Sequence, residues 1–206
     1  MFSKNLEPSH RPYHHGNLRQ ALLLAAEAAL EKNGVANLSL RELSRMVGVS
    51  HTSPRRHFAD KQALLDALAQ NGFQRFDAAL ARASESRSRD FTTRLTKTAQ
   101  AYVDFALKHP ALWTLMFEAK HRPGAPPDLL AASDAAFSRL ATILRSGQES
   151  GEIIPGDPGQ LSLTFHTALV GLVWVSTKGK FKGVPLHELV PLMIKHILVG
   201  LRPRAQ

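Results

Sequence analysis

The sequence has no cysteine among its 206 residues. This excludes a disulfide framework, a thiolate metal site and a thiol nucleophile, and it permits a reducing compartment. The sequence also lacks a run of the roughly 18 apolar residues that cross a bilayer. The N-terminal stretch MFSKNLEPSHRPYHHGN has no apolar segment followed by a small-residue cleavage site. These absences predict a soluble, cytoplasmic protein without a membrane partner.

Familiar catalytic patterns are missing as well. The sequence holds no G-x-S-x-G elbow, no H-E-x-x-H pair and no phosphate-binding glycine loop. His10, His14 and His15 could suggest a metal clip, but adjacent histidines do not easily close a tetrahedral site without other ligands. We therefore expect no enzymatic activity, no cofactor and no metal.

What is present is helical periodicity. Apolar residues recur at three- and four-residue spacing, no segment alternates as a strand would, and no internal repeat is visible. The fold class predicted is all-α, with about nine helices. The hydrophobic content of 44% is enough for one large domain or two small ones.

Basic residues outnumber acidic ones by 26 to 17, for a formal net charge of +9. Such a balance favours a polyanionic partner, but a merely basic surface would give the same sum. Part of this excess lies in residues 41–61, which hold five basic and two acidic side chains.

The segment before and around this excess is typical of two short helices joined by a glycine turn. A first helix of about four turns ends at Gly34. Ser39 and Glu42 then form a capping box for a helix from Leu40 to about Val47, with Leu38 and Leu43 as a hydrophobic staple. Gly48 ends that helix, and Ser50 offers a cap to a second one.

Pro54 restricts how this second helix can begin. A proline inside a helix costs roughly 3 kcal/mol, but most of that cost disappears in the first turn. Ser50 and Thr52 are both possible caps, and a start at Ser53 would leave about one turn. A long regular helix through this segment is excluded.

A helix-turn-helix places the amino end of its second helix in the major groove of DNA. Ser50, His51, Thr52 and Ser53 would then approach base edges, while Arg55, Arg56 and His57 would meet phosphates and Phe58 would return to the core. The alternative interpretation is an ordinary solvated face of scattered charges.

The following segments predict a connecting helix and a larger helical region. Asp60 caps a helix that continues to about Ala83, and SESRSRD at 84–90 is polar. Further helices are expected over 91–108, with a break at His109-Pro110, and up to Gly151. The predicted domains are 1–60, which binds DNA, the connecting helix 61–83, and 84–206.

LSLRELSRMVGVSHTSPRRHFADKQALLDAL, together with YHHGNLR at 13–19, resembles the DNA-binding domain of the TetR/AcrR family of bacterial transcriptional regulators. The resemblance implies that Thr52, Ser53, Arg55, His57 and Lys61 touch the operator. Arg55 stands where the family commonly has a tyrosine. The full predicted DNA-contacting set is Tyr13, Arg41, Ser50, His51, Thr52, Ser53, Arg55, Arg56, His57 and Lys61.

The C-terminal region is similar to the family branch with the WHG-type domain. AYVDFALKHPALWTLMF at 101–117 carries most of that likeness, and HTALVGLV at 166–173 keeps only Gly171 of the naming motif. The resemblance implies a homodimer through the last two helices, about 159–177 and 185–201. Their nearly continuous apolarity independently favours burial by a partner.

Aromatic and apolar residues of this region could line a pocket for a small apolar ligand or could simply form the core. The predicted ligand-binding residues are Phe105, Trp113, Met116, Phe117, His166 and Trp174. His166 could equally be a hydrogen-bonded core histidine.

The function predicted is a ligand-responsive transcriptional repressor that binds a palindromic double-stranded DNA operator as a homodimer. Two alternatives stay open. One is a sequence-tolerant architectural DNA-binding protein, and the other is a small-molecule sequestering protein with a vestigial helix-turn-helix.

Overall fold

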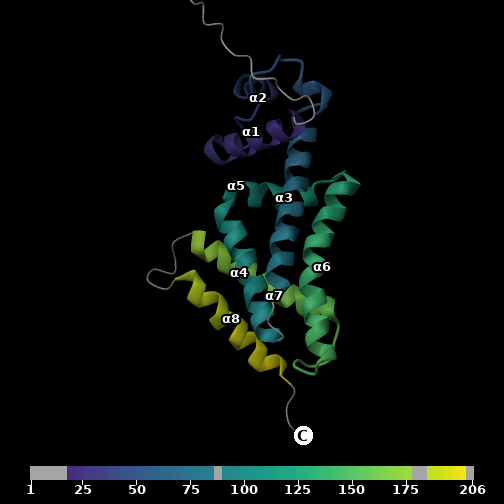
Figure 1. Cartoon of the computed structure of the whole chain (residues 1–206), viewed down its shortest axis with the longest axis vertical. Coiled ribbons are helices and arrows are strands. Elements are labelled where there is room, and N and C mark those ends of the chain that lie inside the picture. Colours follow the sequence, from purple (N-terminus) through teal and green to yellow (C-terminus); the bar gives the residue numbers. More distant parts are fainter. Residues whose placement is uncertain (1–17, 86–89, 178–184, 203–206) are drawn as a thin grey trace, which may run out of the picture. The chain divides into compact units, whose positions relative to one another are not determined.

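The computed structural model describes residues 18–85, 90–177 and 185–202. Within these ranges all regular structure is helical, with eight α-helices, one 3₁₀ helix and no strand (Figure 1). The all-α prediction is confirmed. The chain divides after Lys61 into two compact units, here called the N-terminal unit and the C-terminal unit.

The N-terminal unit contains α1 (Leu18–Asn33), α2 (Leu40–Val47) and the 3₁₀ helix η2 (Pro54–Arg56). Helix α1 ends as expected at Gly34, whose φ of 72° lies in the left-handed region. Helix α2 packs against both α1 and η2. The core of the unit is apolar and fully enclosed, with buried Leu22, Leu23, Ala26, Leu30, Leu38, Leu43 and Phe58.

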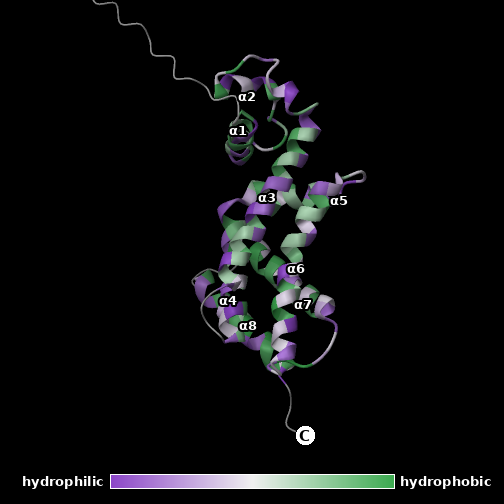
Figure 2. Cartoon of the chain, turned by 45° about the vertical axis from the view of Figure 1, so that its right-hand side comes forward, coloured by the Kyte–Doolittle hydropathy of each residue, from purple (hydrophilic) through white to green (hydrophobic). Residues whose placement is uncertain are grey.

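The C-terminal unit is built on α3 (Lys61–Ser84), which begins at Lys61 and continues into this unit. It is followed by α4 (Phe91–Lys108), α5 (Pro110–His121), α6 (Pro127–Glu149), α7 (Pro158–Thr177) and α8 (Leu186–Leu201). Helix α4 is central, because it packs against α5, α6, α7 and α8. Figure 2 shows hydrophobic and hydrophilic residues distributed around these helices, as expected for helices with one buried face.

His109 and Pro110 separate α4 from α5, as predicted. His109 ends α4 by donating its backbone N–H to the Phe105 carbonyl, and its own backbone has left the helical region, with φ −130° and ψ 60°. Pro110 begins α5, where a missing N–H removes no helical hydrogen bond. Pro191 lies inside α8, where a bend was expected from the sequence.

Two ion pairs attach α3 to its neighbours in the C-terminal unit. The guanidinium of Arg122, just beyond α5, donates to the Asp66 carboxylate at 2.8 Å, and Asp66 is buried. The guanidinium of Arg139 on α6 donates to both carboxylate oxygens of Asp77. Breaking a partly buried pair leaves an uncompensated charge, so these contacts fix the register of α3 against α5 and α6.

Candidate functional site

The first half of the predicted helix-turn-helix is present in detail. Ser39 Oγ accepts the backbone N–H of Glu42 at 3.2 Å and caps α2. Leu38 and Leu43, which flank the cap, are both buried, as a hydrophobic staple requires. Gly48 has φ 75° and closes the helix by donating its N–H to the Arg45 and Ser44 carbonyls.

The second half differs from a short α-helix that begins at Ser50. Between Gly48 and Lys61, a stretch that the structure describes throughout, the only regular helix is the 3₁₀ turn η2, with Pro54 as its first residue. This matches the shortest alternative, a start at Ser53 that leaves about one turn. Proline explains the outcome, because its missing N–H costs nothing at the first position and would cost a bond further in.

Side-chain hydroxyl groups replace the missing turn before Pro54. Ser50 Oγ lies 3.1 Å from Thr52 Oγ1 and 2.7 Å from Ser53 Oγ, and the Ser53 N–H donates to the Ser50 carbonyl. Serine and threonine compete with the helical ladder through such local bonds. The result is a compact polar turn at 50–53 directly before η2.

Two buried residues anchor the turn to the core of the N-terminal unit. Pro54 is buried and Phe58 is 2% exposed, and the Pro54 carbonyl accepts the N–H groups of both His57 and Phe58 at 2.9 Å. The Arg19 guanidinium on α1 lies 5.5 Å from the centre of the Phe58 ring, a cation–π contact. Phe58 lies in the core, as predicted, and its contact with Arg19 joins the turn to α1.

Most of the predicted DNA-contacting side chains are exposed around this turn, and we call this set the polar–basic turn. The exposed members are Ser50, His51, Thr52, Arg55, Arg56 and His57, with Ser53 half-buried. Arg41 is also exposed, in the first turn of α2. Tyr13 and the three histidines considered for a metal clip, His10, His14 and His15, lie outside the described residues.

Lys61 has a structural partner that the sequence did not indicate. Its ammonium group donates to the Ala36 carbonyl, at 3.1 Å, in the loop between α1 and α2. An ammonium carries three donors, so this bond uses one of them. Lys61 is half-buried, and it holds the loop between α1 and α2 within the N-terminal unit.

The C-terminal unit gathers most of its aromatic rings in one place, which we call the aromatic cluster. Five helices supply them, α3 to α7, with ring-centre distances of 4.8–6.3 Å. The members are Phe73, Phe76, Tyr102, Phe105, Trp113, Phe117, Phe137 and His166.

Polar groups inside the cluster are held uncharged or are enclosed by rings. Burial, followed by the positive charge of Lys120, lowers the pKa of His166 to about 4. Burial raises the pKa of Tyr102, whose hydroxyl lies 3.2 Å from His166 Nδ1. Lys120 Nζ lies 4.2 Å from the Phe137 ring centre and 5.0 Å from that of Phe117, and burial lowers its pKa.

Four of the six predicted ligand residues are in this cluster: Phe105, Trp113, Phe117 and His166. Met116 is fully buried on α5 and faces α3, where a Cβ on Gly72 would lie 2.7 Å from its Sδ. Trp174 is 54% exposed near the end of α7, so its exposure separates it from the buried rings.

Sequence reasoning missed Tyr102, Lys120 and Phe137. Tyr102 is one helical turn before Phe105, so helical spacing alone could have placed it on the same face. Phe137 comes from α6, and only the tertiary packing brings it to His166, at 4.8 Å between ring centres. Lys120 could not be predicted because a charged side chain is normally expected in solvent, and only the packed structure shows its ammonium group over two aromatic rings.

The described parts of the chain contain neither a candidate metal site nor a candidate membrane-spanning helix. No three His, Asp or Glu side chains there are arranged to hold a metal ion. None of the helices there combines the length and the apolarity that crossing a membrane requires.

Comparison with known proteins agrees with this architecture. Residues 22–68 match the family model for bacterial regulatory proteins of the TetR family, and residues 95–196 match the tetracyclin repressor-like C-terminal domain. A solved structure of a protein with unknown function from Rhodococcus sp. RHA1 is 42% identical, with a TM-score of 0.88, and the alignment covers 94% of this chain and 100% of that one.

More distant structures share the fold. A TetR family transcription regulator from Marinobacter aquaeolei VT8 is 21% identical, with a TM-score of 0.71 over 90% of this chain and 96% of that one. The TetR family transcriptional regulator PfmR from Thermus thermophilus is 19% identical, with a TM-score of 0.66 over 88% of this chain and 99% of that one. No curated protein matches the chain significantly by sequence.

The helix-turn-helix unit and the helical C-terminal unit together define a DNA-binding transcription regulator. The chain belongs to the TetR family of transcription regulators.

Proposed function

We propose that this TetR family regulator is a repressor that binds a near-palindromic operator as a homodimer and is released by a small ligand. The observation that carries the proposal is the polar–basic turn, whose hydroxyl and basic side chains are exposed while Pro54 and Phe58 anchor it. A rigid, outward-facing turn of this composition suits insertion into a major groove.

Two groups of residues would make different contacts with the operator, one with base edges and one with phosphates. We propose that Ser50, His51, Thr52 and Ser53 contact base edges, because short hydroxyl and imidazole side chains let the backbone approach closely. Arg41, Arg55, Arg56, His57 and Lys61 would contact phosphates, which fix register and orientation without reading sequence. Tyr13, in the segment YHHGNLR that resembles the family's DNA-binding domain, is proposed as a further phosphate contact.

Dimerisation through α7 and α8 is supported by apolar side chains that these helices expose. Leu163 is 64% exposed, Leu192 46% and Val199 66%. An apolar groove of about 530 Å³ lies between the two helices, and Gly171 forms part of its lining. A Cβ at Gly171 or Gly200 would meet nothing within 4 Å, so both positions offer room for a partner helix. A four-helix interface between two copies would cover this surface.

The ligand site is proposed at the aromatic cluster, with Trp113, Phe117 and His166 as contacts. Buried rings with a few polar groups among them are typical of sites for small, largely apolar molecules. A ligand there would change the separation of the two DNA-binding units of a dimer. Successive major grooves lie about 34–36 Å apart, so a different separation loses one half-site.

Selection of bound sequences from random duplex DNA tests the central part of this proposal. We expect the selected pool to contain an inverted repeat with half-sites about one helical turn apart. Selection without any sequence preference would contradict the proposal and would favour the architectural alternative. Absence of salt-dependent DNA binding would favour the sequestering alternative.

Ligand response has its own test, with the selected operator in hand. Small apolar molecules that bind the chain in calorimetry should lower its operator affinity. A bound molecule that leaves operator affinity unchanged would contradict a ligand-controlled repressor.

A further inference from the structure

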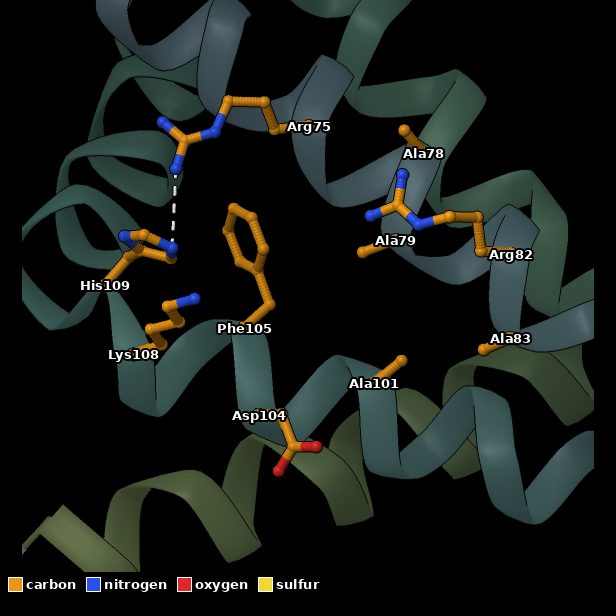
Figure 3. Close-up of a pocket in the computed structure, with 10 residues that line it drawn as sticks. All are labelled: Arg75, Ala78, Ala79, Arg82, Ala83, Ala101, Asp104, Phe105, Lys108 and His109. Carbon is orange, nitrogen blue, oxygen red and sulfur yellow. Dashed lines mark hydrogen bonds between the residues drawn. The ribbon is translucent and has the colours of Figure 1, made fainter. Parts of the chain in front are cut away.

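A concave surface lies between α3 and α4 and shares Phe105 with the aromatic cluster. It is an open groove of about 640 Å³, which falls within the usual range for small-molecule sites. Its floor is small and apolar, formed by Ala78, Ala79, Ala83 and Ala101, with the ring of Phe105 beside them (Figure 3). We call it the α3–α4 groove.

Basic side chains surround this apolar floor. Arg75 and Arg82 project from α3, and Lys108 comes from the end of α4 (Figure 3). Among the described residues that line the groove, Asp104 is the single acidic one, so three positive charges face one negative charge. In Figure 3 the Asp104 carboxylate is directed away from both arginines, which leaves the space between the helices positive in character.

One end of the α3–α4 groove is already ordered by a hydrogen bond. Arg75 Nη2 lies 3.3 Å from His109 Nε2, and arginine can only donate, so His109 is the acceptor. The His109 ring also contacts Phe105, with 5.1 Å between ring centres. The Arg75 guanidinium is thereby positioned at the point where α4 ends and α5 begins.

We propose that the α3–α4 groove binds an organic anion with a short apolar body, of the class of medium-chain carboxylates. The carboxylate would lie among Arg75, Arg82 and Lys108, because guanidinium and ammonium groups bind carboxylates through charge-assisted hydrogen bonds. The apolar body would cover the alanine floor and the edge of Phe105. A ligand with only a charge would leave the alanine floor uncovered, and a ligand with only an apolar body would leave the basic side chains unpaired.

This site is distinct from the proposed ligand site at the aromatic cluster. The two share Phe105, but every member of the cluster is buried or half-buried, whereas Arg82 and Lys108 are exposed. Binding in the α3–α4 groove can be measured without DNA, so its outcome is independent of whether the chain represses transcription.

Isothermal titration calorimetry of the full chain with octanoate tests the proposal. We expect saturable binding of one octanoate per chain. Octan-1-ol, which has the apolar body without the charge, should bind at least about tenfold more weakly, as expected for loss of hydrogen bonds to charged groups. Acetate at equal ionic strength should give no saturable binding, because it lacks the apolar body.

Variants locate the site. Arg82→Gln and Lys108→Gln change exposed side chains, and each should weaken octanoate binding by about threefold to tenfold. Ala101→Leu places a larger side chain on the groove floor and should abolish binding. Lys97→Gln is the matched control, since Lys97 is exposed on α4 but does not line the groove, and its affinity should equal that of the wild type.

Each of the following results would overturn the proposal. The wild type shows no saturable octanoate binding, or it binds octanoate and octan-1-ol with equal affinity, or Lys97→Gln weakens octanoate binding as much as Lys108→Gln does. Thermal melting of each variant accompanies the titration. A folded Ala101→Leu variant that binds octanoate like the wild type would also exclude the groove.

Discussion

Arg55 follows directly after the buried Pro54 and is exposed, so its position is fixed at the backbone while its charge stays available. This combination suits a phosphate contact. Arg55→Ala should reduce the slope of log affinity against log salt by about 0.9, because one fewer counterion is released on binding. The measurement is operator affinity at several salt concentrations.

Two comparisons make the Arg55 result specific. Arg145→Ala removes an exposed arginine from α6 in the C-terminal unit and should leave the slope unchanged. Lys61→Ala should reduce the slope like Arg55→Ala, and it should also lower stability because Lys61 holds the Ala36 carbonyl. A wild-type slope for Arg55→Ala would remove Arg55 from the interface.

His166 makes the stability of the protein depend on pH. Its pKa is lowered from 6.5 to about 4 in the folded protein, so the folded state holds this ring neutral. The unfolded chain binds the extra proton first as pH falls, and the stability that is complete above pH 6.5 is lost progressively down to about pH 4. The loss stays below about 3.4 kcal/mol, because water around the half-buried ring screens part of the effect.

His166→Gln should flatten this dependence when the free energy of unfolding is measured by denaturant titration between pH 7 and pH 4. His187→Gln is the control, since the His187 side chain is 76% exposed, and it should follow the wild-type curve. Equal slopes for His166→Gln and the wild type would show that another group carries the dependence.

The turn between α2 and η2 depends on one backbone conformation. Gly48 has φ 75°, and side chains other than glycine pay about 1–2 kcal/mol there. Gly48→Ala should therefore lower the unfolding free energy by about that amount, as measured by thermal or denaturant unfolding. Gly48→Asn should lose less, because asparagine tolerates the left-handed region. Equal losses in the two variants would argue against backbone strain as the cause.

The helices themselves could largely be predicted from the sequence, because their end signals are local. Ser39, Gly48 and the His109-Pro110 break act within one turn, and the structure places helix ends at each of them. Of the three starts that the sequence left open for the second helix, the structure has the shortest, a 3₁₀ turn after Ser53, and not an α-helix from Ser50. Three neighbouring hydroxyl groups and Pro54 together stabilise an i to i+3 turn, and their balance cannot be read from single-residue preferences.

The two candidate sites differ in how far they could be predicted from the sequence. The polar–basic turn is continuous in sequence, so its residues could be recognised together from the sequence alone. The aromatic cluster draws on five helices, and its members Tyr102 and Phe137 become neighbours of His166 only after packing. Trp174 looked similar in sequence to Trp113, yet one side chain is 54% exposed and the other is 9% exposed.

The assembly of two copies depends on the exposed apolar surface of α7 and α8. Val199 is 66% exposed on α8, and a charge at this position would be buried without a partner in the proposed interface. Val199→Glu should convert a dimer to a monomer in sedimentation velocity and should lower operator affinity by more than tenfold, since the second half-site is lost. Leu130→Glu, at a 39% exposed position on α6, is the control and should stay dimeric.

A dimeric Val199→Glu variant would show that another surface joins the two copies. A monomeric wild-type chain that still selects an inverted repeat would show that assembly takes place only on DNA. In that second case the variant should still lose affinity for the full repeat, but not for an isolated half-site.

The central claim is that the polar–basic turn enters the major groove of duplex DNA. Backbone amide chemical shifts, measured by NMR while the selected duplex is added to the protein, test it most directly. The account predicts that the largest shifts fall on residues 50–53 and 55–57, with smaller ones in the first turn of α2. Shifts confined to the C-terminal unit, with the amides of these residues unchanged at saturation, would contradict it.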